Sequence, residues 1–198
     1  MGVLGAAFNP PHVGHLVLAQ EAAAQLELER VLLVPTGRAP HREIPADPGP
    51  RVRLEMTEAA ASGNDLLEVD PREVEAAERS EEPSYTADTL EGLARDGSGE
   101  VVWIMGADAA AGLEGWRAPE RILELARLGI AGRSGVETSE VAAVLRRLGA
   151  AERAKFIDMP EIGISSTMLR ERVVGGRPIR YLVPEAVAEL IAERGLYA

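Results

Sequence analysis

Short apolar runs and longer amphipathic stretches alternate along the chain. Apolar runs of about four to eight residues between turn residues predict buried strands. Stretches with apolar residues three and four apart predict helices that pack on one side. The predicted strands are 2–7, 31–34, 66–69, 101–105, 128–131 and 155–159. The predicted helices are 14–25, 51–61, 87–95, 119–127, 139–148, a segment ending at about 174, and 184–193.

This alternation predicts a Rossmann-like, doubly wound parallel α/β sheet with helices on both faces. We expect a single domain over 1–198, with a C-terminal helical portion from about 165. Ligands of such sheets bind at the carboxyl ends of the strands, where the strand order switches. Strands 2–7 and 101–105 are therefore expected to be neighbours at that point.

Three connections are predicted to be irregular. Residues 36–50 are rich in Pro and Gly, and residues 106–116 follow the most strand-like run of the chain. Residues 71–82 are acidic, which favours a solvated loop.

Composition narrows the classes of partner. The 198 residues carry a net charge of −11, so an extended nucleic acid is not expected to bind. No run approaches the roughly 18 apolar residues of a membrane span, and we expect no secretory signal. The absence of cysteine excludes thiolate chemistry and fits a cytoplasmic protein. Lys155 is the only lysine, so no Gly-Lys-Ser/Thr phosphate loop exists.

The first strand-to-helix connection, Gly5 to His15, is the strongest candidate site. His12 and His15 lie about one helical turn apart, so both rings can lean to the same side. Gly14 between them lets a phosphate approach, and the new helix presents free amides. No acidic residue precedes Glu21. We interpret this loop as a binding site for nucleotide phosphates. A zinc site is one alternative, but no third ligand stands at a spacing typical of zinc sites. A structural role for the histidines is the other alternative.

A second anion site is predicted at Ser165-Ser166-Thr167-Met168-Leu169-Arg170. Helix starts usually carry acidic residues, but this one has none before Glu171, and it has three hydroxyls and an arginine. A helix cap is the structural alternative.

Other candidates lie outside this motif. Asp108 after Gly106 suits a ribose hydroxyl, and Trp116 suits stacking on a ligand ring. Arg42 is the best arginine for a phosphate, ahead of Arg38 and Arg133.

These motifs resemble a known enzyme group. The runs Gly5-x-x-Phe8-Asn9-Pro10-x-His12-x-Gly14-His15 and Ile164-Ser165-Ser166-Thr167-x-x-Arg170 are similar to the HxGH nucleotidyltransferase superfamily. Further stretches, Pro40-His41-Arg42, Pro83-Ser84-Tyr85-Thr86 and Gly106-x-Asp108 followed by Trp116, resemble bacterial nicotinate-nucleotide adenylyltransferases over nearly the whole chain. The resemblance implies the nucleotidyltransferase fold and adenylyl transfer from ATP to nicotinate mononucleotide, with release of deamido-NAD and pyrophosphate in NAD biosynthesis.

The resemblance also implies roles for individual residues. Catalytic roles fall on His12, His15, Ser166 and Arg170. ATP would bind at Gly5, Ala6, Ala7, Phe8, Gly14, His15, Gly106, Arg133, Ile164, Ser165 and Ser166. Nicotinate mononucleotide would bind at Asn9, Arg42, Ser84, Tyr85, Thr86, Asp108 and Trp116. Mg²⁺ is expected as a cofactor held mainly by ATP phosphates, without a protein metal site. The oligomeric state stays open, with a homodimer among the options.

The loop departs from its apparent relatives at three positions. Ala6, Ala7 and Asn9 stand where the family more often has Gly, Thr and Asp. We expect altered contacts there and an unchanged reaction. The free amides of the helix that starts near Thr86 favour a carboxylate, and hence nicotinate over its amide, although Asp88 opposes this. Alternatives are an adenylyltransferase for nicotinamide mononucleotide or phosphopantetheine, and a nucleotide-binding regulator without turnover. A dehydrogenase is disfavoured because Gly-x-Gly-x-x-Gly is missing.

Overall fold

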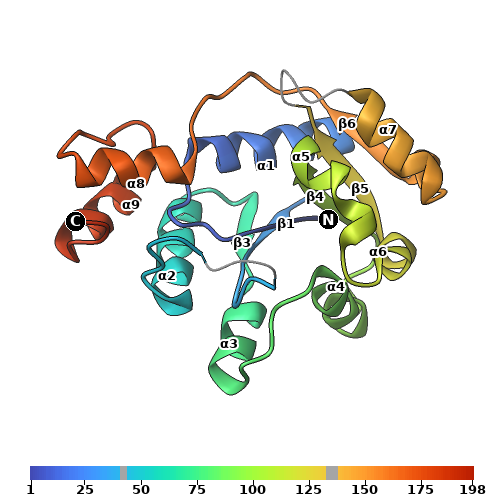
Figure 1. The fold of residues 1–198 in the computed structure, drawn as a ribbon, viewed down its shortest axis with the longest axis horizontal. Coiled ribbons are helices and arrows are strands. Elements are labelled where there is room, and N and C mark those ends of the chain that lie inside the picture. Colours follow the sequence, from blue (N-terminus) through green and yellow to red (C-terminus); the bar gives the residue numbers. More distant parts are fainter. Residues whose placement is uncertain (41–43, 133–137) are drawn as a thin grey trace. The chain divides into compact units, whose positions relative to one another are not determined.

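The computed structural model describes residues 1–40, 44–132 and 138–198 (Figure 1). The strands are β1 Gly2–Ala6, β2 Val31–Pro35, β3 Leu67–Val69, β4 Val101–Gly106, β5 Ala126–Ala131 and β6 Ala154–Ile157. The α-helices are α1 Val13–Leu26, α2 Pro50–Ala61, α3 Arg72–Arg79, α4 Thr86–Arg95, α5 Ala107–Ala111, α6 Pro119–Leu125, α7 Thr138–Arg147, α8 Ser166–Val174 and α9 Glu185–Glu193. Two short 3-10 helices are η1 Leu113–Gly115 and η2 Ala151–Arg153.

The strands form a sheet in the order β3-β2-β1-β4-β5-β6. β1 pairs in parallel with β4, with Leu4 opposite Ile104, and the pairs β4–β5 and β5–β6 are parallel too. The strand order switches between β1 and β4, as in a doubly wound α/β sheet. The predicted parallel sheet and the predicted neighbourhood of the first and fourth strands are therefore confirmed.

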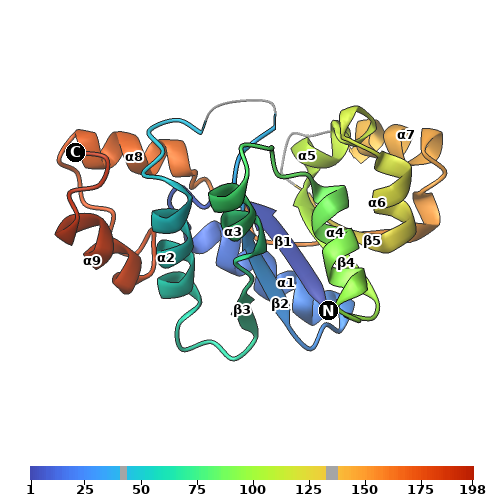
Figure 2. The same ribbon diagram turned by 90° about the horizontal axis from the view of Figure 1, so that it is seen from below.

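Close packing groups the residues into two compact units. The first unit comprises Met1–Gly5, Leu18–Leu32 and Tyr85–Glu161; the second comprises Ala6–Val17, Leu33–Ser84 and Ile162–Ala198. In the first unit β5 lies between β4 and β6. The helix α4 packs on α6, and α5 packs on α7 (Figure 2). In the second unit α2 packs on α3 and on α9. The single domain stays a prediction.

Each unit has its own apolar interior. In the first unit, β4 is buried from Val101 to Met105, and Trp103 packs inside it as expected for a core residue. In the second unit, a buried cluster joins Met56 of α2, Leu169 of α8 and Val187 of α9. Burial of a side chain of this size contributes roughly 1.5 to 3 kcal/mol. The cluster therefore fixes α8, whose first residues are candidate site residues, against the rest of its unit.

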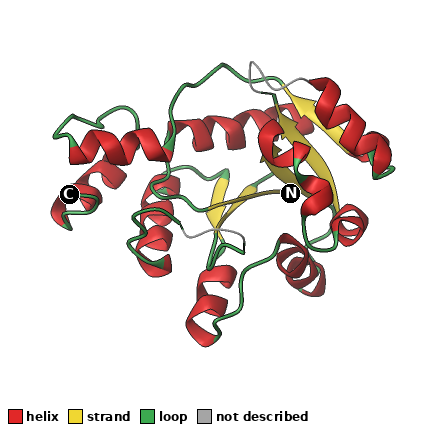
Figure 3. Cartoon of the chain, in the orientation of Figure 1, coloured by secondary structure: helices red, strands yellow, loops and turns green. Residues whose placement is uncertain are grey.

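The prediction of a solvated loop at 71–82 is wrong, because α3 occupies much of it, as Figure 3 shows in red. The helix buries Glu73, Val74 and Ala77, which form one stripe along it. Glu75 and Arg79 form an ion pair across one turn. The many acidic residues suggested solvation, but three of them belong to a helix, and one of these, Glu73, lies on its buried face.

The irregular connection predicted at 106–116 is also partly wrong. The helix α5 begins directly after β4, and η1 follows it. Ala107 and Ala110 are buried, and alanine has the highest helix propensity of all residues. Asp108 and Trp116 thus sit in and beside short helices instead of on a free loop. Among the helices that the structure describes, none combines the length and the apolar character needed to cross a bilayer.

A prediction about stability follows from the packing of Gly5 against Trp103. A Cβ atom at position 5 would lie 2.7 Å from the Trp103 ring, which is itself buried, so Gly5→Ala should destabilise the fold by about 1 to 3 kcal/mol. Urea unfolding measures this change. Gly106→Ala is the matched control, because a Cβ there meets no described atom within 4 Å. Equal unfolding free energies for the two variants would contradict the packing argument.

Candidate active site

The connection from β1 to α1 is buried for much of its length. Phe8 is 1% exposed and adopts a positive φ of 49°, which turns the chain between strand and helix. Its ring meets the His15 ring edge to face, with 5.0 Å between the centroids. Aromatic pairs in this arrangement are attractive because the ring edge is positive and the face is negative. Phe8 therefore supports the His15 ring and is not free to contact a ligand with its whole surface.

His12 and His15 lie with their ring centroids 3.8 Å apart, which confirms that both rings lean to the same side. The backbone N–H of His12 donates to His15 Nδ1 at 3.2 Å. Since Nδ1 accepts, the proton of the neutral ring is assigned to Nε2. This backbone contact fixes both the tautomer and the direction of the ring. His15 therefore presents an Nε2–H donor, the group that a phosphate oxygen requires.

Gly14 is needed for a reason that the sequence does not reveal. A Cβ at this position would lie 3.0 Å from Nδ1 and 3.1 Å from Cε1 of His12. The ring of His12 thus covers the space where a side chain would begin. Access of a phosphate to the Gly14 backbone stays a prediction, whereas the approach of the His12 ring is observed.

The start of α8 meets the same loop. Ser165 caps the helix by accepting from the Met168 amide at 3.2 Å, as its position predicts. The Ser166 hydroxyl donates to the Pro10 carbonyl oxygen at 2.9 Å, and Arg170 Nη1 donates to the Asn9 carbonyl oxygen at 2.7 Å. The two motifs, 156 residues apart at Ser166 and Pro10, are therefore brought together within the second unit.

This cluster has the properties of an anion site. It combines two imidazoles, a helix start without an acidic residue in its first turn, and an arginine. Arg170 uses its guanidinium on Asn9 and on Thr167 Oγ1, and its five N–H groups allow further bonds. Donors fixed by their own packing bind an anion without a cost for ordering them. The geometry suits a phosphate chain.

Tyr85 and Thr86 begin α4 in the first unit. Tyr85 holds the N-cap position, but no side chain caps the helix, so the amides of its first turn suit a bound carboxylate. Arg117 lies 4.5 Å above the Tyr85 ring and pairs with Asp88 at 3.0 Å. The negative charge of Asp88, which argued against a carboxylate here, is therefore balanced. Arg117 was missed from the sequence; its only signal is its place next to Trp116.

Gly106, Asp108 and Trp116 also belong to the first unit. Gly106 ends β4, Asp108 is exposed in the first turn of α5, and Trp116 is half-buried directly after η1. The space beside Gly106 is open among the described atoms, as close approach of a ligand requires. These positions are compatible with the roles implied by resemblance, which stay predictions.

Other candidates have structural partners. The Ala6 carbonyl oxygen accepts from the Thr36 amide at 2.9 Å. The Ala7 carbonyl oxygen accepts from Arg53 Nη1 at 3.0 Å. Ser84 Oγ accepts from the Arg38 amide at 3.3 Å. Gly5 packs against Trp103. Ile164 packs against the buried cluster of α2, α8 and α9. The Asn9 side chain is hydrogen-bonded to Pro45 and Tyr197.

Two candidates cannot be placed. Arg42 and Arg133 lie outside the described residues, as does His41. Among the residues that are described, no cluster of three His, Cys, Asp or Glu side chains could hold a metal ion. Mg²⁺ commonly keeps several waters and binds through substrate phosphates, and its binding here stays a prediction.

Comparison with known proteins places the chain. Residues 3–172 match the family model described as cytidylyltransferase-like. A Roseiflexus castenholzii protein named "Probable nicotinate-nucleotide adenylyltransferase" is 42% identical, over 99% of this chain and 96% of its own. A Rubrobacter xylanophilus protein of the same name is 36% identical, over 100% of this chain and 91% of its own. The chain belongs to the nicotinate-nucleotide adenylyltransferase family.

The fold agrees with solved members of this group. The Plasmodium falciparum nicotinic acid mononucleotide adenylyltransferase complexed with NaAD superposes with a TM-score of 0.78, over 99% of this chain and 96% of that one. The sequences are only 14% identical, so this likeness concerns the fold. The predicted nucleotidyltransferase fold is therefore confirmed, independently of the motifs that first suggested the nicotinate-nucleotide adenylyltransferase family.

The contact of Gly14 with His12 gives a prediction for the loop. Gly14→Ala should displace the His12 ring, because a new methyl group would sit 3.0 Å from Nδ1. The imidazole ¹⁵N resonances of His12 and His15 should shift. The melting temperature should change little, since alanine also favours the helix. Unchanged imidazole resonances would contradict the assigned packing, and Ala24→Gly, an exposed site in the same helix, serves as control.

Proposed function

We propose that the chain transfers the adenylyl group of ATP to nicotinate mononucleotide, giving deamido-NAD and pyrophosphate in NAD biosynthesis. The observation that carries the proposal is the meeting of the His12–His15 loop with the start of α8. Family membership agrees with it. The net charge of −11 disfavours an extended nucleic acid as a partner. A cytoplasmic protein that binds no nucleic acid is part of the proposal.

The reaction needs positioning and charge stabilisation more than acid–base chemistry. The 5′-phosphate of the mononucleotide attacks the α-phosphorus of ATP in line, and pyrophosphate leaves. This nucleophile is already an anion, so no general base is required. His12 and His15 hold the α- and β-phosphates while negative charge develops. Ser165, Arg170 and the first amides of α8 hold the departing pyrophosphate, while the Ser166 hydroxyl donates to the Pro10 carbonyl oxygen.

Mg²⁺ is part of the proposal as a cofactor that ATP phosphates would mainly hold. When bound, it would supply positive charge that offsets the charge of the leaving pyrophosphate. The chain's own contribution is the set of donors at His15, Ser165 and the first amides of α8. Ser165 Oγ already caps the helix, so its hydroxyl hydrogen is available to donate to a phosphate oxygen.

The second substrate is recognised by its carboxylate at the start of α4. The amides of the first turn favour an anion, and no side chain caps this helix. Arg117 offsets the charge of Asp88, so the local field stays favourable to the nicotinate carboxylate. Trp116 stacks on the pyridine ring, and Asp108 accepts from a ribose hydroxyl. This arrangement disfavours nicotinamide mononucleotide and phosphopantetheine, and the intact histidines disfavour a regulator without turnover.

Pyrophosphate release with ATP and Mg²⁺ tests the acceptor. Nicotinate mononucleotide should be used at least about tenfold better, as kcat/KM, than its amide, since one charge-assisted contact contributes roughly 1.5 kcal/mol or more. Arg117→Met should reduce this preference by leaving Asp88 unbalanced. Arg121→Met is the matched control. Arg121 also pairs with an acidic residue of α4, but this partner, Glu91, lies away from the start of the helix. Equal rates with both acceptors would refute the carboxylate site.

His15→Ala tests the catalytic loop. Loss of one preorganised donor to the phosphates should lower kcat by roughly 10² or more, with an unchanged circular dichroism spectrum. Gln20→Ala, an exposed change in α1, should leave kcat at the wild-type value. A His15→Ala enzyme with a near-normal rate would rule out the role assigned to this residue.

A further inference from the structure

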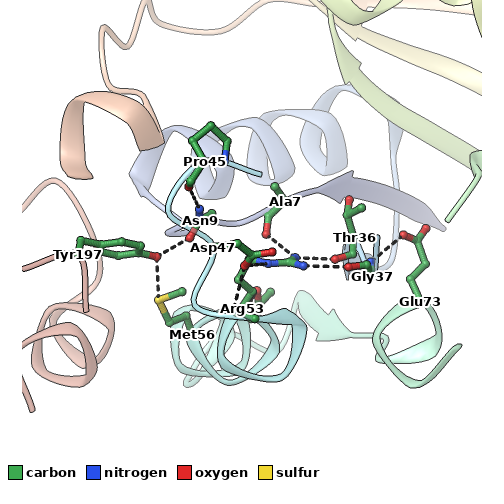
Figure 4. A network of polar contacts seen from close by, with 12 residues as sticks. Ala7, Asn9, Thr36, Gly37, Pro45, Asp47, Arg53, Met56, Glu73 and Tyr197 are labelled. Carbon is green, nitrogen blue, oxygen red and sulfur yellow. Dashed lines mark hydrogen bonds and ion pairs between the residues drawn. The ribbon is translucent and has the colours of Figure 1, made fainter. Parts of the chain in front are cut away.

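Asn9 lies just before the two histidines, and its polar atoms are bound within the second unit (Figure 4). Its side-chain Nδ2 donates to the Pro45 carbonyl oxygen at 2.8 Å, and its Oδ1 accepts from the Tyr197 hydroxyl at 2.6 Å. Its backbone oxygen accepts from Arg170. The residue is only 2% exposed. Asn9 thus joins three segments that are distant in sequence to the loop that carries His12 and His15.

The two side-chain contacts require an amide. Pro45 offers only a carbonyl acceptor, so its partner must donate, and the Tyr197 hydroxyl donates to the other end of the same group. An aspartate could accept from Tyr197 but would place a carboxylate oxygen against the Pro45 carbonyl. The asparagine at position 9 therefore suits both contacts, and an aspartate would not.

Arg53 anchors the same loop on the other side of Phe8. Its guanidinium is fully buried and donates to the Ala7 carbonyl oxygen at 3.0 Å (Figure 4). It also pairs through Nε with Asp47 at 2.8 Å, on the segment that contains Pro45. The loop is therefore tied to residues 45–47 twice, once through Arg53 and once through Asn9. Both contacts therefore hold the part of the loop that precedes His12.

Among the partners of Asn9, Tyr197 is the one farthest from it along the sequence. It contacts Met56 Sδ at 3.8 Å besides Asn9. Burial raises the pKa of the Tyr197 hydroxyl above its usual range; Asp47 also raises it, while Arg170 and Arg53 oppose the change. The hydroxyl therefore keeps its proton at neutral pH and remains a donor to Asn9.

We propose that Asn9 is a positioning residue for the His12–His15 loop, held in place by the Tyr197 hydroxyl and the Pro45 carbonyl. The proposal rests on the proposed function, because it assigns Asn9 an effect on the rate of adenylyl transfer. Asn9 does not contact substrate in this role; it acts through His12, His15 and Arg170. This differs from the direct contact with nicotinate mononucleotide that resemblance implied for Asn9.

Tyr197→Phe is the decisive variant, because it removes one hydroxyl and keeps the ring. We expect kcat to fall about five- to tenfold, the equivalent of one lost buried hydrogen bond, with the KM for each substrate changed less than about twofold. Tyr181→Phe, at an 82% exposed tyrosine of the same unit, should match the wild type. A normal kcat for Tyr197→Phe, whether or not its melting temperature falls, would overturn the proposal.

Changes at Asn9 separate positioning from general stability. Asn9→Asp should lower kcat at least as much as Tyr197→Phe, since it loses the donor to Pro45. Adding Tyr197→Phe to Asn9→Ala should lower kcat less than about twofold further, because the hydroxyl acts through Asn9. The proposal would be overturned if the double variant lost kcat by the product of the two single losses. An Asn9→Asp enzyme with a normal kcat would overturn it as well.

Imidazole ¹⁵N resonances provide a readout that does not depend on the reaction. Tyr197→Phe should shift the resonances of His12 and His15 in the free protein, and Tyr181→Phe should not. A wild-type protein inactive with every acceptor would refute the proposed function, while shifted resonances would still support the positioning role. Unshifted resonances would overturn the positioning role, even in an active enzyme.

Discussion

The buried guanidinium of Arg53 donates to backbone carbonyl groups that lie beyond the carboxyl ends of two parallel strands, where the strand pairing has ended. Where β1 and β2 end, the carbonyl oxygens of Ala7, Thr36 and Gly37 point past the last strand pairs, and Arg53 donates to all three. Each carbonyl left buried without a donor would cost roughly 1 to 3 kcal/mol. Its charge is balanced by Asp47. A single side chain of α2 therefore sets the course of two connections, one of which carries the histidines.

The donors of the candidate site owe their directions to contacts with backbone atoms. The His12 amide orients His15, the Pro10 carbonyl holds Ser166, and the Asn9 carbonyl holds Arg170. The contacts of His15 and Arg170 use only part of their hydrogen-bonding groups, and both side chains have further N–H groups that suit an anion. Preorganisation of this kind suits phosphate transfer, where the protein supplies orientation and field but no covalent chemistry.

The sequence predicted the sheet and most helices, because apolar periodicity and helix starts are local signals. Anion binding at the two motifs stays a prediction. The sequence failed at α3, where a buried stripe was hidden by acidic composition, and at α5, where five residues are too few to show a period. It also could not reveal that Ser166 and Arg170 bind the loop, that His12 covers Gly14, or that Arg117 balances Asp88. These are contacts between segments far apart in the chain, which no local pattern encodes. Arg42 and Arg133 lie outside the described residues, so their roles remain predictions.

The bond between Tyr197 and Asn9 spans 188 residues. During synthesis on the ribosome, Asn9 and both histidines are made well before the hydroxyl that fixes Asn9. Contacts of such long range form after local helices, since the entropy of closing the intervening loop must first be overcome. The placement of Asn9 beside the histidine loop is consequently completed only after Tyr197 has been made, 188 residues later in the chain.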